Sequence, residues 1–234
     1  MFIEIVSHCY SVRMPEYAHY LNYQLSSLIL DCPKYCDVIS CVCVDENDSY
    51  TIEYVQWFMK HTSLSIRLIL LSSEQMSWRA IGRNQAAITT DADIVWFTDC
   101  DYFFRDGVLD KLAEYPWPFS GCIIFPRTVR VGSAISEIKH PCIKDIDLDN
   151  YKSKEYFRPT GGVQITQGET IREYGYLKDY IKYQNPKGNP FDKCCDDDVR
   201  FRAVIQKLTE KEAVRIELPG VYRIMHRRNG RNIQ

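Results

Sequence analysis

The stretch that decides the fold is Ile94-Val95-Trp96-Phe97-Thr98-Asp99-Cys100-Asp101-Tyr102, in which an apolar run ends in two aspartates separated by one residue. A short, continuous apolar run is typical of a strand that is buried on both faces of a parallel sheet. At strand periodicity Asp99 and Asp101 project to the same side, where a divalent cation or a hydroxyl would find both carboxylates. Two acids this close repel each other without a ligand, so solvated loop carboxylates are the less favoured alternative.

Strand-like and helix-like segments alternate upstream of this run, and this order predicts a doubly wound parallel sheet. Ligands of such sheets bind at the carboxyl ends of the strands. The expected strands are Phe2–Val6, Val38–Val44, Ser65–Leu71 and Ile94–Thr98, and the expected helices lie around 17–29, 52–59 and 77–90.

The elements downstream are shorter and less regular. Asp106 is expected to cap a short helix that runs through Tyr115 and that Pro116-Trp117-Pro118 ends. The polar stretch from Pro141 to Pro159 is expected to be an irregular loop. The other expected elements are strands at Ser120–Phe125, Val129–Val131, Gly162–Thr166, Val214–Leu218 and Val221–Met225, and helices at Glu169–Tyr183 and Asp198–Leu208.

Composition narrows the class of protein. The 234 residues include 29 Lys and Arg against 31 Asp and Glu, a near balance that argues against a general nucleic-acid binder. The longest apolar run, Ile66–Leu71, contains Arg67, so we expect no membrane span. The strand-like start at Phe2 lacks the features of a secretory leader.

The sequence contains ten cysteines, which could form disulfides, bind zinc or remain reduced. Their spacing includes no C-x-x-C pair, which disfavours a zinc knuckle. In the absence of secretion signals, we expect reduced, mostly buried thiols in a reducing compartment.

The segment Thr98-Asp99-Cys100-Asp101 resembles the D-x-D signature of nucleotide-sugar glycosyltransferases with the GT-A fold. Further segments in the expected order are similar to motifs of glycosyltransferase family 2 and of the β-1,4-galactosyltransferases (family 7). Those similar to family 2 are Val6–Tyr10, Cys43–Asp48 and Gly82–Ala87; Gly161–Gln164 resembles a Gly-Gly strand of galactosyl- and N-acetylgalactosaminyltransferases, and Cys194–Val199 with Arg202, and then Arg223–Arg227, resemble galactosyltransferase segments.

This resemblance implies an α/β fold of the GT-A, Rossmann-like type in one domain over residues 1–234. The central sheet is expected to be mostly parallel and flanked by helices, with a smaller antiparallel element on the acceptor side. Residues 1–104 would be the nucleotide-binding half and residues 105–234 the acceptor-binding and catalytic half. The stem and anchor of the animal Golgi enzymes are not seen, which implies a soluble, cytoplasmic protein of bacterial or viral origin.

The resemblance also implies a nucleotide-sugar donor, most simply UDP-linked, a glycan acceptor and a Mn²⁺ or Mg²⁺ ion. Asp101 is expected to bind the metal directly, with Asp99 nearer the ribose or just outside the ligand set. His226 would be a further ligand, and an imidazole favours Mn²⁺; the alternative is a surface histidine in a basic tail. The other residues expected at the donor are Ser7, Cys9, Tyr10, Asp45, Arg83 and Gly162. A turn role for Asp45 and a surface ion pair for Arg83 remain open.

The general base is expected at the start of a late helix. Counting back from Arg202 by the spacing of the similar family places it at Asp196, with Asp197 as the neighbour to test next. Carboxylates also suit a helix start without any catalytic role, and Cys195 stands where that family has a glutamate. A single base implies inversion at the anomeric carbon.

Three other functions remain open at this point. A sugar nucleotidyltransferase is disfavoured because Ser7–Ser11 contains no glycine. A non-catalytic carbohydrate- or nucleotide-binding protein would keep the fold but not the reaction. A retaining transferase would share the D-x-D motif. Trp117, beside two prolines, is expected either to stack on a sugar or to pack in the core.

Overall fold

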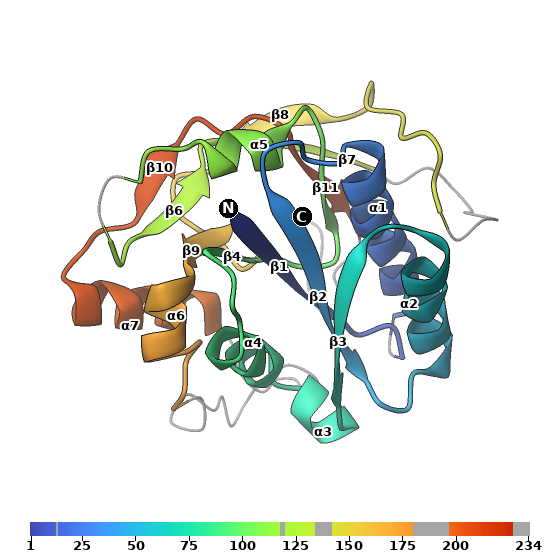
Figure 1. The fold of residues 1–234 in the computed structure, drawn as a ribbon, viewed down its shortest axis with the longest axis horizontal. Helices are drawn as coiled ribbons and strands as arrows, with labels where there is room; N and C mark the ends of the chain where they lie inside the picture. Colours follow the sequence, from blue (N-terminus) through green and yellow to red (C-terminus); the bar gives the residue numbers. More distant parts are fainter. Residues whose placement is uncertain (13, 118–119, 134–141, 180–196, 227–234) are drawn as a thin grey trace, which may run out of the picture.

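Two β-sheets and the helices that cover them form the structure (Figure 1). It is a computed structural model, and it describes residues 1–12, 14–117, 120–133, 142–179 and 197–226. The elements that position the candidate site come from both ends of the chain.

The larger sheet has seven strands in the order β10-β6-β9-β4-β1-β2-β3. The neighbours β1, β2, β3 and β4 are parallel, as expected for a doubly wound sheet. The strands are β1 (Phe2–Cys9), β2 (Asp37–Asp45), β3 (Ser65–Leu71), β4 (Ile94–Phe97), β6 (Ile123–Pro126), β9 (Gln164–Gln167) and β10 (Val214–Ile216).

The expectation of a mostly parallel sheet holds in part, because this sheet is mixed: four of its six neighbouring pairs are parallel and two are antiparallel. Strand β9 runs antiparallel to both of its neighbours, β4 and β6, and pairs Gln164 with Phe97 and Gln167 with Ile94. The periodicity of a strand reveals that it exists but not which way it runs, since direction depends on how the chain returns to the sheet.

The smaller sheet has the order β5-β11-β7-β8 and is also mixed, since β11 is parallel to β7 and antiparallel to β5. Two of its strands were not expected. Strand β5 is only three residues long, and β8 is fully exposed and lies in the stretch expected to be a loop. The strands are β5 (Tyr102–Phe104), β7 (Thr128–Ser133), β8 (Lys152–Glu155) and β11 (Val221–Met225).

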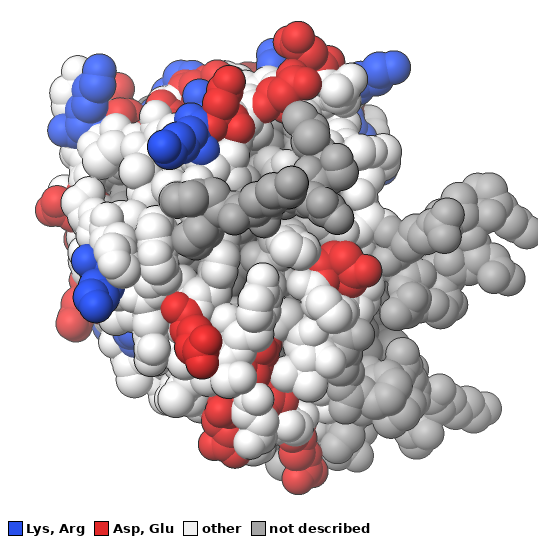
Figure 2. Space-filling view, turned by 90° about the vertical axis from the view of Figure 1, so that its right-hand side faces the viewer, with Lys and Arg blue, Asp and Glu red and all other residues white. Residues whose placement is uncertain are grey.

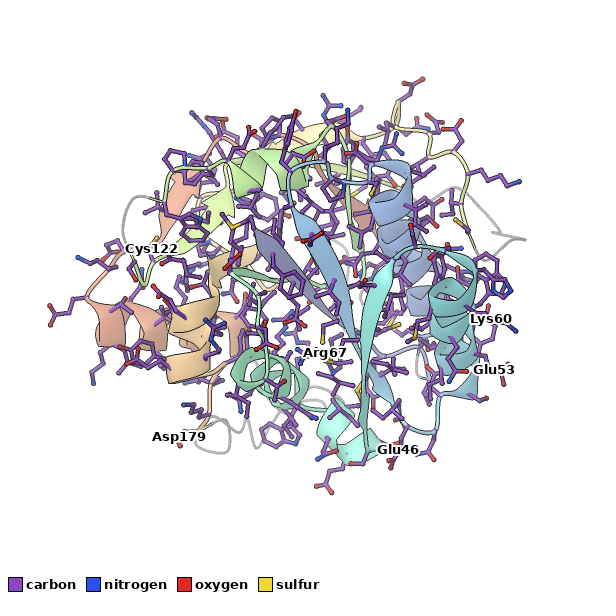
Figure 3. The ribbon with its side chains drawn as sticks, viewed as in Figure 1. Glu46, Glu53, Lys60, Arg67, Cys122 and Asp179 are labelled. Carbon is purple, nitrogen blue, oxygen red and sulfur yellow. The ribbon has the colours of Figure 1, made fainter. Side chains whose placement is uncertain are left out.

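Helices cover both faces of the larger sheet, and alternation along β2 shows how. Val42 packs with buried residues of α1 and α2, whereas Cys41 and Cys43 pack with residues of α4. Figure 3 shows Glu53 and Lys60 on the outer side of α2. The helices are α1 (Glu16–Leu30), α2 (Ser49–His61), α3 (Ser73–Met76), α4 (Arg79–Ile88), α5 (Val108–Ala113), α6 (Gly168–Tyr174) and α7 (Asp197–Thr209).

Three helix expectations differ from the structure. The helix expected at 77–90 is α4, which is shorter, and a separate helix that was not expected, α3, precedes it and begins with a capping box of Ser72 and Gln75. Helix α5 follows Gly107, whose φ of 66° is left-handed, and Asp106 does not cap it. Helix α6 ends at Tyr174, before a glycine with φ of 70°.

Surface charge is dispersed on the face shown in Figure 2. Acidic side chains are scattered there among uncharged ones, and basic side chains lie mainly near its upper and left edges. The eight cysteines within the described ranges form no disulfide bonds, and five of them are buried. None of the helices in the described ranges has the length and hydrophobicity needed to cross a bilayer.

Candidate active site

The acidic pair lies in a tight turn directly after β4. The backbone N–H of Thr98 still donates to Val6 of β1, and that of Tyr102 donates to the carbonyl of Asp99. Strand β4 ends at Phe97, so strand alternation does not set the directions of Asp99 and Asp101. Each carboxylate instead has its own partners, supplied by different elements.

Arg83 of α4 anchors Asp99 from inside the protein. It is fully buried, and its Nη2 lies 2.9 Å from Oδ1 of Asp99, 3.0 Å from the carbonyl of Thr98 and 2.9 Å from that of Gly161. Its Nη1 donates to the hydroxyl of Tyr176 at 2.9 Å. Burial alone would lower the pKa of Arg83, but Tyr176 and Asp99 offset it and the pKa is raised. The alternative of a surface ion pair is therefore wrong.

Arg79, one helical turn before Arg83, links Asp99 to the start of α7. Its Nη2 lies 2.9 Å from Oδ1 of Asp197, and its Nη1 lies 3.6 Å from Oδ1 of Asp99. Asp197 is fully buried, and its Oδ2 has no hydrogen-bond partner among the described residues. We call Asp99, Asp197, Arg79 and Arg83 the Asp99 network.

Asp101 is held by the last strand. Its Oδ2 lies 3.1 Å from Nε of Arg223 and 3.1 Å from Nε2 of His226. The side chain of His226 is only 10% exposed and packs on the rings of Tyr17 and Tyr20, so it is not a histidine of a solvated tail. Oδ1 of Asp101 is buried and accepts no hydrogen bond from a described residue. We call Asp101, Arg223 and His226 the Asp101 cluster.

The expected metal ligands are brought together only in part. No group of three His, Cys, Asp or Glu side chains within the described ranges has the geometry to hold a metal ion. Asp101 and His226 are adjacent and offer a free buried oxygen and an imidazole, whereas Asp99 faces two arginines. These two residues fit a divalent cation that takes its other ligands from a bound molecule.

His8 lies near the Asp99 network as a neutral group. Burial lowers its pKa from 6.5 to about 3; Arg79 and Arg83 lower it further, while Asp99 opposes them. Its Nε2 is buried and has no partner in the described part of the chain. At neutral pH the imidazole therefore contributes a polar atom but no charge.

The other expected donor residues lie at the carboxyl ends of β1 and β2, where Cys9 pairs with Val44. Ser7 and Cys9 are fully buried, and Oγ of Ser7 has no partner among the described residues. Asp45 uses Oδ1 to accept from the backbone and side chain of Asn47, which is the turn role left open above. Its Oδ2 is buried and has no partner in the described ranges. Tyr10 follows β1 and is half-buried.

The two glycines before β9 lie beside the acidic turn. A Cβ on Gly161 would lie 3.7 Å from both Asp99 and Asp198, which places this backbone between the turn and α7. A Cβ on Gly162 would lie 2.1 Å from the ring of Tyr102, and its carbonyl accepts from Trp96. The glycine at Gly162 is therefore required by packing against Tyr102. Its predicted contact with the donor stays a prediction.

Of the two expected base residues, Asp196 lies outside the described residues, and Asp197 begins α7. The sequence reasoning missed Arg79, Tyr176 and His8. Arg79 had a usable signal, because residues four apart on a helix share a face and Arg83 was already a candidate. Tyr176 had no such signal, since it lies just after the end of α6, far from Arg83 along the chain.

Comparison with solved structures identifies what the fold is similar to. TarS from S. aureus in complex with UDP has a TM-score of 0.61 and 14% identity, covering 96% of this chain and 61% of that one. TarS with UDP-GlcNAc gives 0.56 and 15%, covering 98% and 60%. The mannosyltransferase PcManGT from Pyrobaculum calidifontis, with GDP-Man and Mn²⁺, gives 0.63 and 12%, covering 97% and 58%.

At these identities the comparisons show the fold. The chain shares the α/β architecture of these structures, which hold UDP, UDP-GlcNAc or GDP-Man, and it spans about 60% of their length. A scan against family models and a search of curated proteins found no match.

Proposed function

We propose that this chain is a metal-dependent, inverting glycosyltransferase that moves a sugar from a UDP-linked donor to a hydroxyl of a glycan. The observation that carries the proposal is the Asp101 cluster. A buried carboxylate oxygen without a partner lies beside an imidazole, just after the carboxyl end of β4. The fold is shared with structures that hold UDP, UDP-GlcNAc and GDP-Man.

In this proposal Asp101 and His226 hold Mn²⁺ or Mg²⁺, and Asp99 stays outside the direct ligand set. The ion, when bound, stabilises the negative charge that develops on the leaving diphosphate. The chain's own part is positional. Arg223 keeps Oδ2 of Asp101 in place, which leaves Oδ1 available.

Residues 1–104 form the nucleotide-binding half, and Ser7, Cys9, Tyr10 and Asp45 surround the base and ribose. A buried polar atom without a partner costs about 1–3 kcal/mol. Oγ of Ser7 and Oδ2 of Asp45 are such atoms among the described residues. A uracil N–H or a ribose hydroxyl would satisfy Asp45, and this supports a nucleotide rather than an apolar ligand.

Residues 105–234 supply the acceptor side and the general base, which we place at Asp196 or Asp197. Arg79 pairs with Oδ1 of Asp197 at 2.9 Å, which holds this carboxylate in place. Oδ2 of Asp197 accepts no hydrogen bond from a described residue, and it is the oxygen that would take the proton of an acceptor hydroxyl. One base acting opposite the leaving group gives inversion.

The first experiment is calorimetry of UDP binding with and without Mn²⁺. Wild type should bind UDP with Mn²⁺, and Asp101→Asn should weaken binding at least about tenfold, as expected when a charged contact of roughly 1.5 kcal/mol or more is lost. Asp91→Asn is the matched control, because Asp91 is an exposed acid outside the site. Absence of UDP binding in wild type, or equal binding by Asp101→Asn, would contradict the donor site.

The second experiment screens UDP- and GDP-sugars for donor hydrolysis and transfer. Asp196→Asn or Asp197→Asn should reduce transfer by about 10²–10⁴-fold while UDP still binds. If both variants keep full activity, the base lies elsewhere. If UDP binds but no donor turns over, the chain is a non-catalytic binding protein.

A further inference from the structure

A cavity lies at the end of β4 opposite the acidic turn. Its volume is about 390 Å³, within the range of about 300–1,000 Å³ that is common for small-molecule sites. It opens beside the amino end of β4, the carboxyl end of β9 and helix α6, near the label N in Figure 1. The lining residues that the argument uses are Asp93, Ile94, Trp117, Gln167, Glu169 and Arg172.

Trp117 forms the aromatic wall of the cavity. From the sequence, this residue was expected either to stack on a sugar or to pack in the core. The side chain is half-buried and packs against the larger core cluster, which fixes the ring in place. No ring contact of Trp117 with another aromatic side chain exists within the described ranges. The indole therefore lines the cavity without an aromatic partner.

Four planar polar side chains line the cavity together with the indole, and each of them forms a hydrogen bond with another residue. Oδ2 of Asp93 accepts from the backbone N–H of Phe2 at 2.7 Å, and Oε1 of Gln167 accepts from Gly121 at 3.0 Å. Oε1 of Glu169 accepts from Ser120 at 2.8 Å, and Nη1 of Arg172 donates to the carbonyl of Ala92 at 3.0 Å.

Each of these four side chains has a second polar atom that forms no hydrogen bond with a described residue. These atoms are Oδ1 of Asp93, Nε2 of Gln167, Oε2 of Glu169 and Nη2 of Arg172. The cavity thus offers both acceptors and donors from side chains that are already oriented. Oriented groups lose little conformational entropy when a ligand binds.

This set of groups matches one ligand chemistry. A sugar ring has an apolar face for an indole and a rim of hydroxyls that both donate and accept hydrogen bonds. The two carboxylates of the lining, those of Asp93 and Glu169, would repel a phosphate or another anion. An apolar ligand would exclude water from these four polar atoms without offering them hydrogen bonds, and each unsatisfied atom would weaken binding.

The geometry points to a saccharide-binding site in this cavity, separate from the transfer centre, with a neutral hexose unit stacked on Trp117. Ile94 and Asp99 are five residues apart across β4 and its turn. The steps of β4 from Ile94 to Phe97 span about 10 Å at roughly 3.3 Å per residue, and the turn that holds Asp99 follows, so the two sites lie at opposite ends of this strand, at a separation that a short oligosaccharide can span. The inference rests on the proposed function only in taking this saccharide to be a distal part of the acceptor glycan.

The test uses calorimetry of the full chain with neutral tetrasaccharides of glucose, galactose, mannose and N-acetylglucosamine. At least one should bind, and Trp117→Ala should weaken it at least about tenfold, the effect of losing a central aromatic contact. Glu169→Ala should weaken it about three- to tenfold, as for one lost hydrogen bond. Glu173→Ala is the matched control, because it is an exposed glutamate on the same helix and does not line the cavity.

The outcomes separate this inference from the proposed function. If no tetrasaccharide binds, or if Trp117→Ala and Glu169→Ala both bind as wild type does, the cavity is not a saccharide site. UDP binding should be unchanged in both variants, and a loss of UDP binding in Glu169→Ala would also overturn the inference. If UDP fails to bind wild type but a tetrasaccharide binds through Trp117 and Glu169, the proposed function fails and the saccharide site stands.

Discussion

Asp99 and Asp101 are separated by one residue, yet their surroundings differ. Asp99 faces two arginines of α4. One of them, Arg83, is fully buried and also donates hydrogen bonds to two backbone carbonyls. Asp101 faces one arginine and one histidine from the end of β11, and one of its oxygens has no partner within the described ranges. The Asp99 network joins α4, α7 and the turn after β4, whereas the Asp101 cluster keeps a buried carboxylate oxygen that accepts no hydrogen bond from a described residue.

The largest effect is expected from breaking the Asp99 network at its buried end. Arg83→Met removes one of the two arginines that face Asp99 and takes the Arg83 donor from the carbonyls of Thr98 and Gly161. Removing one partner of a buried pair costs about 3–5 kcal/mol, so urea unfolding should show a loss of that size. Arg127→Met is the control, because its ion pair with Glu217 is exposed and its loss should leave the free energy of unfolding almost unchanged. Equal losses of unfolding free energy in the two variants would show that the buried contacts of Arg83 do not stabilise the fold.

The next effect concerns the packing beside the Asp101 cluster. Gly162→Ala would place a methyl group 2.1 Å from the ring of Tyr102, whose face lies against Arg223. Overpacking of this kind costs about 1–3 kcal/mol and should also shift Asp101. Gly161→Ala is the matched control, since its methyl would have ordinary contacts at 3.7 Å. The measurement is the free energy of unfolding, and equal values for both variants would contradict the packing role of Gly162.

A third effect is a pH dependence of stability that comes from His8, beside the Asp99 network. The pKa of His8 is about 3 in the folded protein and 6.5 when unfolded, so the unfolded state binds the proton first as pH falls. The stability that His8 contributes is fully present above its unfolded pKa and decreases toward its folded pKa. At about 1.4 kcal/mol per unit, wild type should lose about 2 kcal/mol more than His8→Gln between roughly pH 7.5 and pH 5. Parallel losses in the two proteins would contradict the lowered pKa.

The same contrast explains what the sequence could predict. The strands Ser65–Leu71 and Val221–Met225 agree with their expected bounds, because β-branched and aromatic runs with clear ends leave little ambiguity. The proximity of Asp101 and His226 was also expected, and the two groups lie 3.1 Å apart. The link from Arg79 to Asp197 spans 118 residues and depends on how α4 and α7 approach the turn. No local pattern contains that information, nor does it contain the direction of β9.

The smallest effect on stability should come from the open end of the Asp101 cluster. His226→Gln keeps a polar group near Asp101 but loses the ring contacts with Tyr17 and Tyr20, so unfolding should change by only about 1 kcal/mol. Under the proposed function its effect on Mn²⁺-dependent UDP binding is larger, about tenfold, because a metal ligand is lost. This is the reverse of Arg83→Met, whose main effect is on folding. If His226→Gln binds UDP with Mn²⁺ as wild type does, the histidine only supports Asp101, and the unused oxygen of Asp101 becomes the sole protein ligand that the described residues offer.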